Sequence, residues 1–215
     1  MGIVSFEVKN SYECDVLVAG GGTAGLAAAI SAAREGADVI LCESGGYLGG
    51  IATKGLVTTF MTCYDKKGEN QIIRGIFEEF VNRMVEDDGA IHPSKCKGSD
   101  SYSGYRPHGH YGVTPFMEES FKRVAEAMCI EAGVKLLYHT TVMGCETENN
   151  TIKCAYVAYG ADVYKIVAKQ YIEATGNCSL ATAAGAKTMR GNDDGTVQTA
   201  SLFFQIEGVD KEALD

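Results

Sequence analysis

The sequence predicts an α/β protein with a central parallel sheet and an antiparallel three-stranded meander. The first observation is an apolar run, an alanine-rich stretch and a second apolar run within residues 14–42. A strand, a helix and a strand within about 30 residues imply that the two strands are parallel. The second observation is a change to strand periodicity after residue 140, in three segments separated by short turns.

The N-terminal unit is predicted element by element. Residues 14–19 form a short valine-rich run, which is typical of a strand buried on both faces. Residues 23–35 are rich in alanine and lack proline, so they predict a helix, and Gly36 closes it. Residues 38–42 predict the second strand. This order is typical of a Rossmann-like domain.

The middle of the chain alternates loops and helices. Residues 45–55 are a glycine-dense loop, and the apolar stripe of residues 72–85 predicts an amphipathic helix. Residues from about 90 to 113 are polar and predict a long loop that leaves the domain core and returns to it. Thr114 and Pro115 then predict the cap and first position of a helix that ends at Gly133 and is followed by a strand at residues 134–138.

The C-terminal third is predicted as strands. Residues 140–147 and 152–159 flank a Glu-Asn-Asn turn and favour a hairpin, and residues 163–173 add a third strand. A further strand is predicted at residues 196–206.

A glycine fingerprint joins the first strand to the first helix. Gly20, Gly22 and Gly25 fit the pattern G-x-G-x-x-G. Gly20 permits the tight turn, Gly22 lets the backbone approach a pyrophosphate, and Gly25 lets the helix pack closely on the sheet. The first helical turn, with Thr23 and Ala24, directs N–H groups and partial positive charge at the phosphates.

Glu43 follows the second strand, about 20 residues after the glycines, where a carboxylate accepts hydrogen bonds from a ribose diol. The same carboxylate disfavours NADP, because it repels a 2′-phosphate. The fingerprint alone leaves NAD and FAD open. The next stretch, "GGYLGGIATKGL", favours FAD, whose ribityl chain and ring system extend further from the pyrophosphate. Ser44, Gly49, Gly50 and Thr53 are therefore candidate cofactor contacts.

The segment "DVLVAGGGTAGLAAAISAAREGADVILCESGGYLGGIATKGLV" resembles the N-terminus of FAD-dependent oxidoreductases with the glutathione-reductase-type FAD fold. The resemblance is nearest to the flavoproteins of fumarate reductase and succinate dehydrogenase. The sequence "EATG" is similar to the second FAD motif of the family, which places Ala174, Thr175 and Gly176 near the cofactor. Asn177 departs from the acidic residue usual after that glycine.

The resemblance carries further expectations. The backbone of Val142 is expected to lie against the adenine. FAD is expected to be non-covalent, because no histidine stands between Gly45 and Gly55. Residues 1–195 are expected to form the FAD-binding domain, with residues 196–215 beginning a truncated substrate domain. The chain alone is then expected to bind FAD weakly or not at all and to need a C-terminal half or a partner subunit.

The expected function is oxidation or reduction of a small organic substrate by hydride transfer through FAD. The candidate catalytic residues are Arg106, which could clamp a carboxylate, and His108 and His110, which could move a proton. A solvated loop with incidental histidines explains the same residues. The alternative function is a non-catalytic FAD-binding or dinucleotide-binding module that acts with a partner chain. A third hypothesis is an NAD-only dehydrogenase.

Composition excludes several other classes. A net charge of −9 without a basic cluster argues against nucleic-acid binding. The eight cysteines include no C-x-x-C pair, so no metal site is expected. No apolar run reaches about 18 residues, and the first ten residues lack a signal-peptide pattern, so a cytoplasmic protein without a membrane partner is expected.

Overall fold

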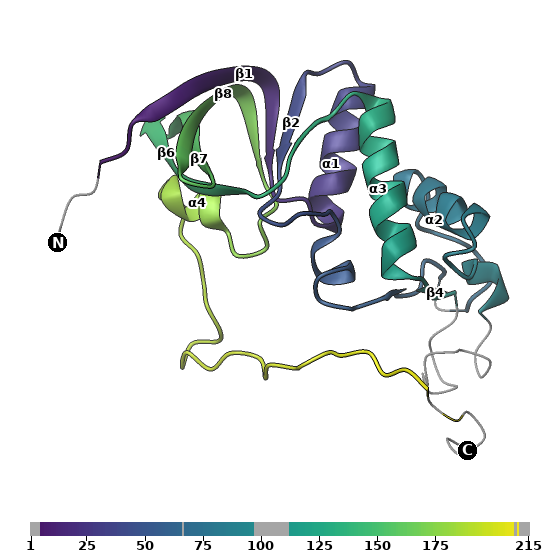
Figure 1. The fold of residues 1–215 in the computed structure, drawn as a ribbon. Coiled ribbons are helices and arrows are strands. Elements are labelled where there is room, and N and C mark those ends of the chain that lie inside the picture. The colour runs from purple at the N-terminus through teal and green to yellow at the C-terminus, as the bar shows by residue number, and fades with distance from the viewer. Residues whose placement is uncertain (1–4, 66, 97–111, 209, 211–215) are drawn as a thin grey trace.

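The computed structural model describes residues 5–65, 67–96, 112–208 and 210. Its centre is a six-stranded sheet in the order β5-β2-β1-β8-β7-β6, with a two-stranded sheet, β3-β4, beside it (Figure 1). The strands are β1 (Val8–Ala19), β2 (Val39–Cys42), β3 (Thr59–Phe60), β4 (Thr114–Pro115), β5 (Lys135–Leu137), β6 (Thr140–Glu148), β7 (Thr151–Tyr159) and β8 (Asp162–Glu173). The helices are α1 (Thr23–Arg34), α2 (Ile76–Glu86), α3 (Glu118–Ala132) and α4 (Ser179–Ala183), with 3₁₀ turns η1 (Gly50–Ala52) and η2 (Pro93–Lys95).

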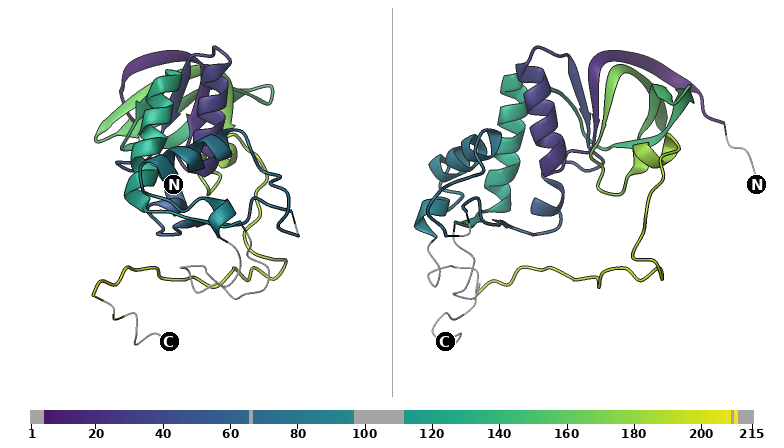
Figure 2. Two further views of the ribbon diagram at one scale, coloured as in Figure 1. Left: turned by 90° about the vertical axis from the view of Figure 1, so that its right-hand side faces the viewer. Right: turned by 180° about the vertical axis from the view of Figure 1, so that it is seen from behind.

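The apolar residues of β1 and β2 contribute to two different hydrophobic cores. Val18 and Leu41 face α1, α2 and α3, where the aromatic rings of Phe80 and Phe121 lie 4.6 Å apart. Alternate residues of the same strands, such as Leu17, join the opposite core with the inner face of the meander. Both faces of β2 and of the last four residues of β1 are therefore largely buried, which explains why these stretches are continuously apolar, whereas the first six residues of β1 are exposed. Figure 2 shows α1, α2 and α3 on one side of β1 and β2, and the curled β6–β8 part of the same sheet with α4 on the other side.

Strand β8 joins the parallel and antiparallel parts of the sheet. It pairs in parallel with β1, up to Ala19 opposite Glu173, and antiparallel with β7 on its other edge. The β6–β7 hairpin turns at Asn149 and Asn150, which have φ of 50° and 58°. Asparagine tolerates this left-handed conformation well. The predicted parallel sheet and three-stranded meander are thus confirmed.

Two predicted helix starts were wrong. Ile72 and Ile73 precede α2, and their N–H groups donate to the carbonyl of Cys63. Gly75 then has a φ of 71°, which is incompatible with continuing the helix backwards. The residues predicted to cap the next helix, Thr114 and Pro115, instead pair with β3, and α3 begins at Glu118. Both errors come from hydrogen bonds with backbone groups outside the predicted helix. An amphipathic pattern does not predict such hydrogen bonds.

The strand predicted at residues 196–206 is also absent from the described structure, where this segment has no regular secondary structure. It runs away from the sheet as an extended yellow trace in Figure 1, and Leu202 and Phe204 are 88% and 70% exposed. A strand needs a neighbour to accept its backbone hydrogen bonds, and apolar alternation alone does not supply one. The contact of Gln205 with Glu118, 2.7 Å, is made by side chains.

Among the described residues, no helix combines the length and the apolar character needed to cross a membrane.

Candidate functional site

A cavity of about 570 Å³ opens at the carboxyl ends of β1, β2 and β8. Ligands of open α/β sheets bind in this position, outside the carboxyl ends of the strands. The predicted site residues that line it are Gly20, Gly22, Thr23, Ala24, Glu43, Ser44, Gly50, Val142, Ala174, Thr175 and Gly176. The other lining residues, which the sequence did not single out as contacts, are Cys42, Ile51, Lys54, Thr140, Thr141, Asn177 and Ser179.

Two of the fingerprint glycines are required by packing within the protein. Gly20 has a φ of 104°, and a Cβ there would stand 2.3 Å from the carbonyl oxygen of Ala174. A Cβ at Gly25 would stand 1.8 Å from the carbonyl oxygen of Gly20. Gly25 does not line the cavity; it lets α1 lie directly on the turn that leaves β1.

Gly22 differs from both. Its φ of −72° and ψ of −177° are open to every amino acid, and a Cβ there would meet no protein atom within 4 Å. It lines the cavity and is the N-cap of α1, and no side chain caps that helix end. The N–H groups and partial positive charge at the start of α1 therefore fit an anionic ligand that approaches the backbone closely.

Glu43 is 5% exposed, and its carboxylate accepts hydrogen bonds from several neighbouring groups. Its Oε2 accepts from the N–H of Gly21 at 2.9 Å, and its Oε1 accepts from the N–H of Gly45 at 2.6 Å and from Lys54 Nζ at 2.5 Å. Burial acts to raise the pKa of Glu43, but the Lys54 ammonium and the two N–H groups outweigh it and hold the pKa below its usual range. The carboxylate is therefore ionised and fixed at the cavity wall.

The second glycine cluster shapes the floor of the site. Gly49 has a φ of 113°, forms a parallel bridge with Gly22, and donates its N–H to the carbonyl of Gly21 at 2.8 Å. Thr53 is buried, and its hydroxyl donates to the carbonyl of Leu48 at 2.8 Å. Neither Gly49 nor Thr53 lines the cavity. The hydrogen bonds of both residues fix the shape of the loop, and their direct contact with a cofactor stays a prediction.

The third wall begins where β8 ends. Asn177 Oδ1 accepts hydrogen bonds from the hydroxyls of Thr175 at 2.8 Å and Ser179 at 2.7 Å. Glu173 holds the turn from below: its Oε1 accepts from the N–H of Thr175 at 2.6 Å, and its Oε2 accepts from the N–H of Leu180 at 2.7 Å. One carboxylate thus ties the Ala174–Gly176 turn to the start of α4, a role that the sequence did not reveal.

We expect Glu173→Gln to lower the free energy of unfolding by about 1–3 kcal/mol near pH 7, because an amide supplies one acceptor oxygen where the carboxylate supplies two. Burial acts to raise the pKa of Glu173, but its hydrogen bonds from Thr175, Ala181 and Leu180 hold that pKa below its usual range. Its contribution is therefore present above the unfolded pKa of about 4.3 and is lost as the pH falls through the folded value. Urea unfolding at pH 7 and pH 4 should show the deficit shrinking in acid.

The matched control is Glu148→Gln, a carboxylate that is 67% exposed and paired with Lys153 at 3.1 Å. An exposed ion pair contributes little, so the control should change stability by less than about 0.5 kcal/mol. Equal losses in the two variants would contradict the bridging role of Glu173.

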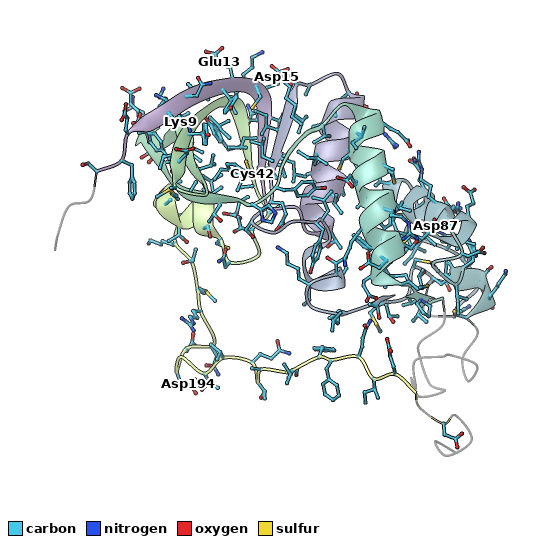
Figure 3. All side chains as sticks on the ribbon, viewed as in Figure 1. Lys9, Glu13, Asp15, Cys42, Asp87 and Asp194 are labelled. Atoms are coloured by element: carbon cyan, nitrogen blue, oxygen red, sulfur yellow. The ribbon has the colours of Figure 1, made fainter. Side chains whose placement is uncertain are left out.

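The remaining wall is β6, which contributes Thr140, Thr141 and Val142. Cys42, labelled in Figure 3, also lines the cavity, and burial raises the pKa of its thiol to about 12, so it is a neutral thiol. The candidate catalytic residues Arg106, His108 and His110 lie outside the described residues.

Comparison with known proteins agrees with this geometry. The family described as FAD dependent oxidoreductase matches residues 15–215. The comparison with curated protein sequences returned no match.

Solved structures share the fold. A geranylgeranyl bacteriochlorophyll reductase-like protein from Thermoplasma acidophilum has a TM-score of 0.57 at 21% identity, covering 82% of this chain and 43% of that chain. THI4 from Thermovibrio ammonificans has a TM-score of 0.54 at 18% identity, covering 81% of this chain and 64% of that chain. The 3-ketosteroid-Δ4-(5α)-dehydrogenase of Rhodococcus jostii RHA1 has a TM-score of 0.51 at 19% identity, covering 78% of this chain and 46% of that chain.

The chain thus spans less than two thirds of each of these structures. At such identities the structures establish the fold, and the family match extends over nearly the whole sequence. The glycine fingerprint, the uncapped N-terminus of α1 and the open space at Gly22 are consistent with both findings. The chain belongs to the FAD-dependent oxidoreductase family, and its cofactor is FAD.

Proposed function

We propose that this chain binds FAD non-covalently and serves hydride transfer between FAD and a small organic substrate. The observation that supports this most directly is Gly22, whose backbone conformation and surroundings accept a Cβ atom, yet which lines the cavity at the uncapped N-terminus of α1. A diphosphate that approaches the backbone there gives a reason for glycine that protein packing does not.

The lining residues suggest a direction for the cofactor. The N–H groups at the start of α1 and the open space at Gly22 suit the diphosphate, and Glu43 suits the adenosine ribose. Val142 on β6 suits the adenine, while Gly50 on the glycine loop and Thr175 after β8 suit the ribityl chain. FAD, when bound, supplies a ring that accepts or donates a hydride.

Non-covalent attachment is supported by the residues available to bond with the flavin. The cavity lining, as far as the described residues form it, includes no histidine, and its one cysteine, Cys42, is protonated near neutral pH. Denaturing the complex in acid should therefore release all of the flavin into the supernatant.

The direct test is titration of FAD with the purified full chain, followed by flavin fluorescence, which detects weak as well as tight complexes. We expect saturable quenching by the chain, with NAD a weaker competitor and NADP weaker still because Glu43 faces the 2′ position. Bleaching of the visible flavin band by an organic donor would identify the substrate class. Failure to bind FAD under all conditions would contradict the proposal.

A further inference from the structure

Lys54 is the second charged residue of the cofactor cavity. It follows the 3₁₀ turn η1, and its ammonium lies 2.5 Å from Glu43 Oε1. The Lys54 side chain is 36% exposed, whereas that of Glu43 is 6% exposed. The cation therefore stands at the mouth of the cavity and reaches inward to a buried carboxylate.

The contacts of Glu43 divide unequally between its two oxygens. Oε1 receives Lys54 Nζ, the N–H of Gly45 and, at 3.2 Å, the hydroxyl of Ser44. Oε2 receives the N–H of Gly21 at 2.9 Å. A carboxylate oxygen has two lone pairs, so Oε1 is saturated while Oε2 keeps capacity for a ligand hydroxyl. Lys54 thus helps to fix which oxygen faces the ligand.

The charge balance of the cavity depends on the same pair. Among the described residues that line it, Glu43 carries the one negative side chain and Lys54 the one positive side chain. Without Lys54, a buried and uncompensated carboxylate would share the cavity with the negatively charged diphosphate of FAD. Removing one partner of a buried pair is costly, because the remaining charge loses its compensation.

We propose that Lys54 is a positioning residue for FAD, which orients the Glu43 carboxylate toward the ribose and cancels its charge beside the diphosphate. This inference rests on the proposed binding of FAD in the cavity. It assigns Lys54 a role through Glu43 and does not require it to touch the cofactor.

The inference predicts a pH signature. The titratable groups around Glu43 are Lys54 from the loop after η1, Cys42 on β2, and Tyr138 and His139 from the β5–β6 connection, where the His139 ring lies against the loop that follows Glu43. Tyr138 and Cys42 are neutral near pH 7, because burial raises the pKa of each. Lys54 is therefore the cation that opposes the effect of burial on Glu43. In its absence the pKa of Glu43 should rise, because the two backbone N–H groups alone would then oppose the effect of burial.

The experiment is the FAD dissociation constant of the full chain, from fluorescence quenching, at about pH 5.5 and about pH 8.5. The native chain should show nearly the same constant at both values. Lys54→Met should bind about tenfold more weakly at the higher pH, and the loss should be smaller at the lower pH, where protonation begins to remove the uncompensated charge of Glu43. Glu43→Gln combined with Lys54→Met should remove the pH dependence.

The matched control is Lys122→Met. Lys122 lies 4.2 Å from the ring centre of Tyr47, and Lys54 lies 6.0 Å from the same ring, but Lys122 pairs with Glu119 rather than Glu43. The control loses the same charge from the same region and should bind FAD like the native chain at both pH values. An equal loss in Lys122→Met would show a general charge effect and overturn the inference.

A second variant guards against misfolding. Lys54→Gln keeps a hydrogen-bond donor while removing the charge, and it should show the same loss at the higher pH, whereas Lys54→Arg should restore the native profile. Native binding of FAD with no pH-dependent loss in Lys54→Met or Lys54→Gln would overturn the inference and leave the proposed function intact. No binding by the native chain would overturn both.

Discussion

Replacing Gly25 with alanine is expected to lower the free energy of unfolding by about 3 kcal/mol or more and to abolish FAD binding. The new Cβ would stand 1.8 Å from the carbonyl oxygen of Gly20 and 3.3 Å from the Cβ of Ala174. The first of these contacts is with backbone, so no rotation of a side chain can relieve it. Helix α1 would have to move away from the turn after β1, and its N-terminus would move with it.

Denaturant unfolding and FAD titration of the same preparations measure both effects. Gly22→Ala is the matched control, because it adds the same methyl group three residues earlier, where no protein atom lies within 4 Å. The control should remain close to native in stability, since an N-cap glycine replaced by alanine loses about 1 kcal/mol or less. Stability of Gly25→Ala equal to that of the control would contradict the close approach of α1 to β1.

Local signals explain why the first half of the site could be predicted. Residues 14–42 contain a strand, a turn, a helix and a strand, and each of them has a clear signal in its own residues, although β1 also pairs with β8 and β2 with β5. Gly20, Gly22 and Glu43 follow from the chemistry that such a unit offers a nucleotide, and the structure brings all three to one cavity. The meander could be predicted for the same reason, because its turns at Asn149 and Gly160 have residues suited to positive φ.

The errors share a different origin. Thr114 and Pro115 have good helix-starting chemistry, but their backbone pairs with Thr59 and Phe60, more than fifty residues away in the sequence. The segment at residues 196–206 has strand composition and no strand neighbour among the described residues. In both cases the outcome depends on a long-range partner, and single-sequence patterns describe only the local preference.

Two of the residues missed at the site, Lys54 and Glu173, are ones that support others. Lys54 lies eleven residues after Glu43, and Glu173 is the first residue of the EATG motif, whose other residues it braces. A general signal was present for Lys54: a carboxylate expected to be buried at a strand end requires a compensating cation nearby. Lys54 was the nearest lysine along the chain, within the same glycine loop. No comparable signal identified Glu173, whose partners are backbone N–H groups created by the fold.

Gly22→Val is expected to have the opposite profile to Gly25→Ala, with nearly native stability and FAD affinity reduced by about 100-fold or more. At a φ of −72° and a ψ of −177°, the backbone of valine is unstrained, and its Cβ meets no protein atom within 4 Å. Its branched side chain would project into the cavity and keep a diphosphate away from the N–H groups that begin α1. Losing two charge-assisted hydrogen bonds, each contributing about 1.5–3 kcal/mol, corresponds to at least that fall in affinity.

Unfolding in urea and flavin fluorescence titration separate these effects, and the series from Gly22 through alanine to valine should weaken binding stepwise. The weakening should also appear for ADP, which carries the diphosphate and lacks the flavin. A variant Gly22→Val that bound FAD like the native chain would place the diphosphate elsewhere, and glycine at this position would then have no explanation in either packing or binding. Because the backbone at Gly22 tolerates any residue, a selective loss of binding would identify the ligand as the reason for this glycine.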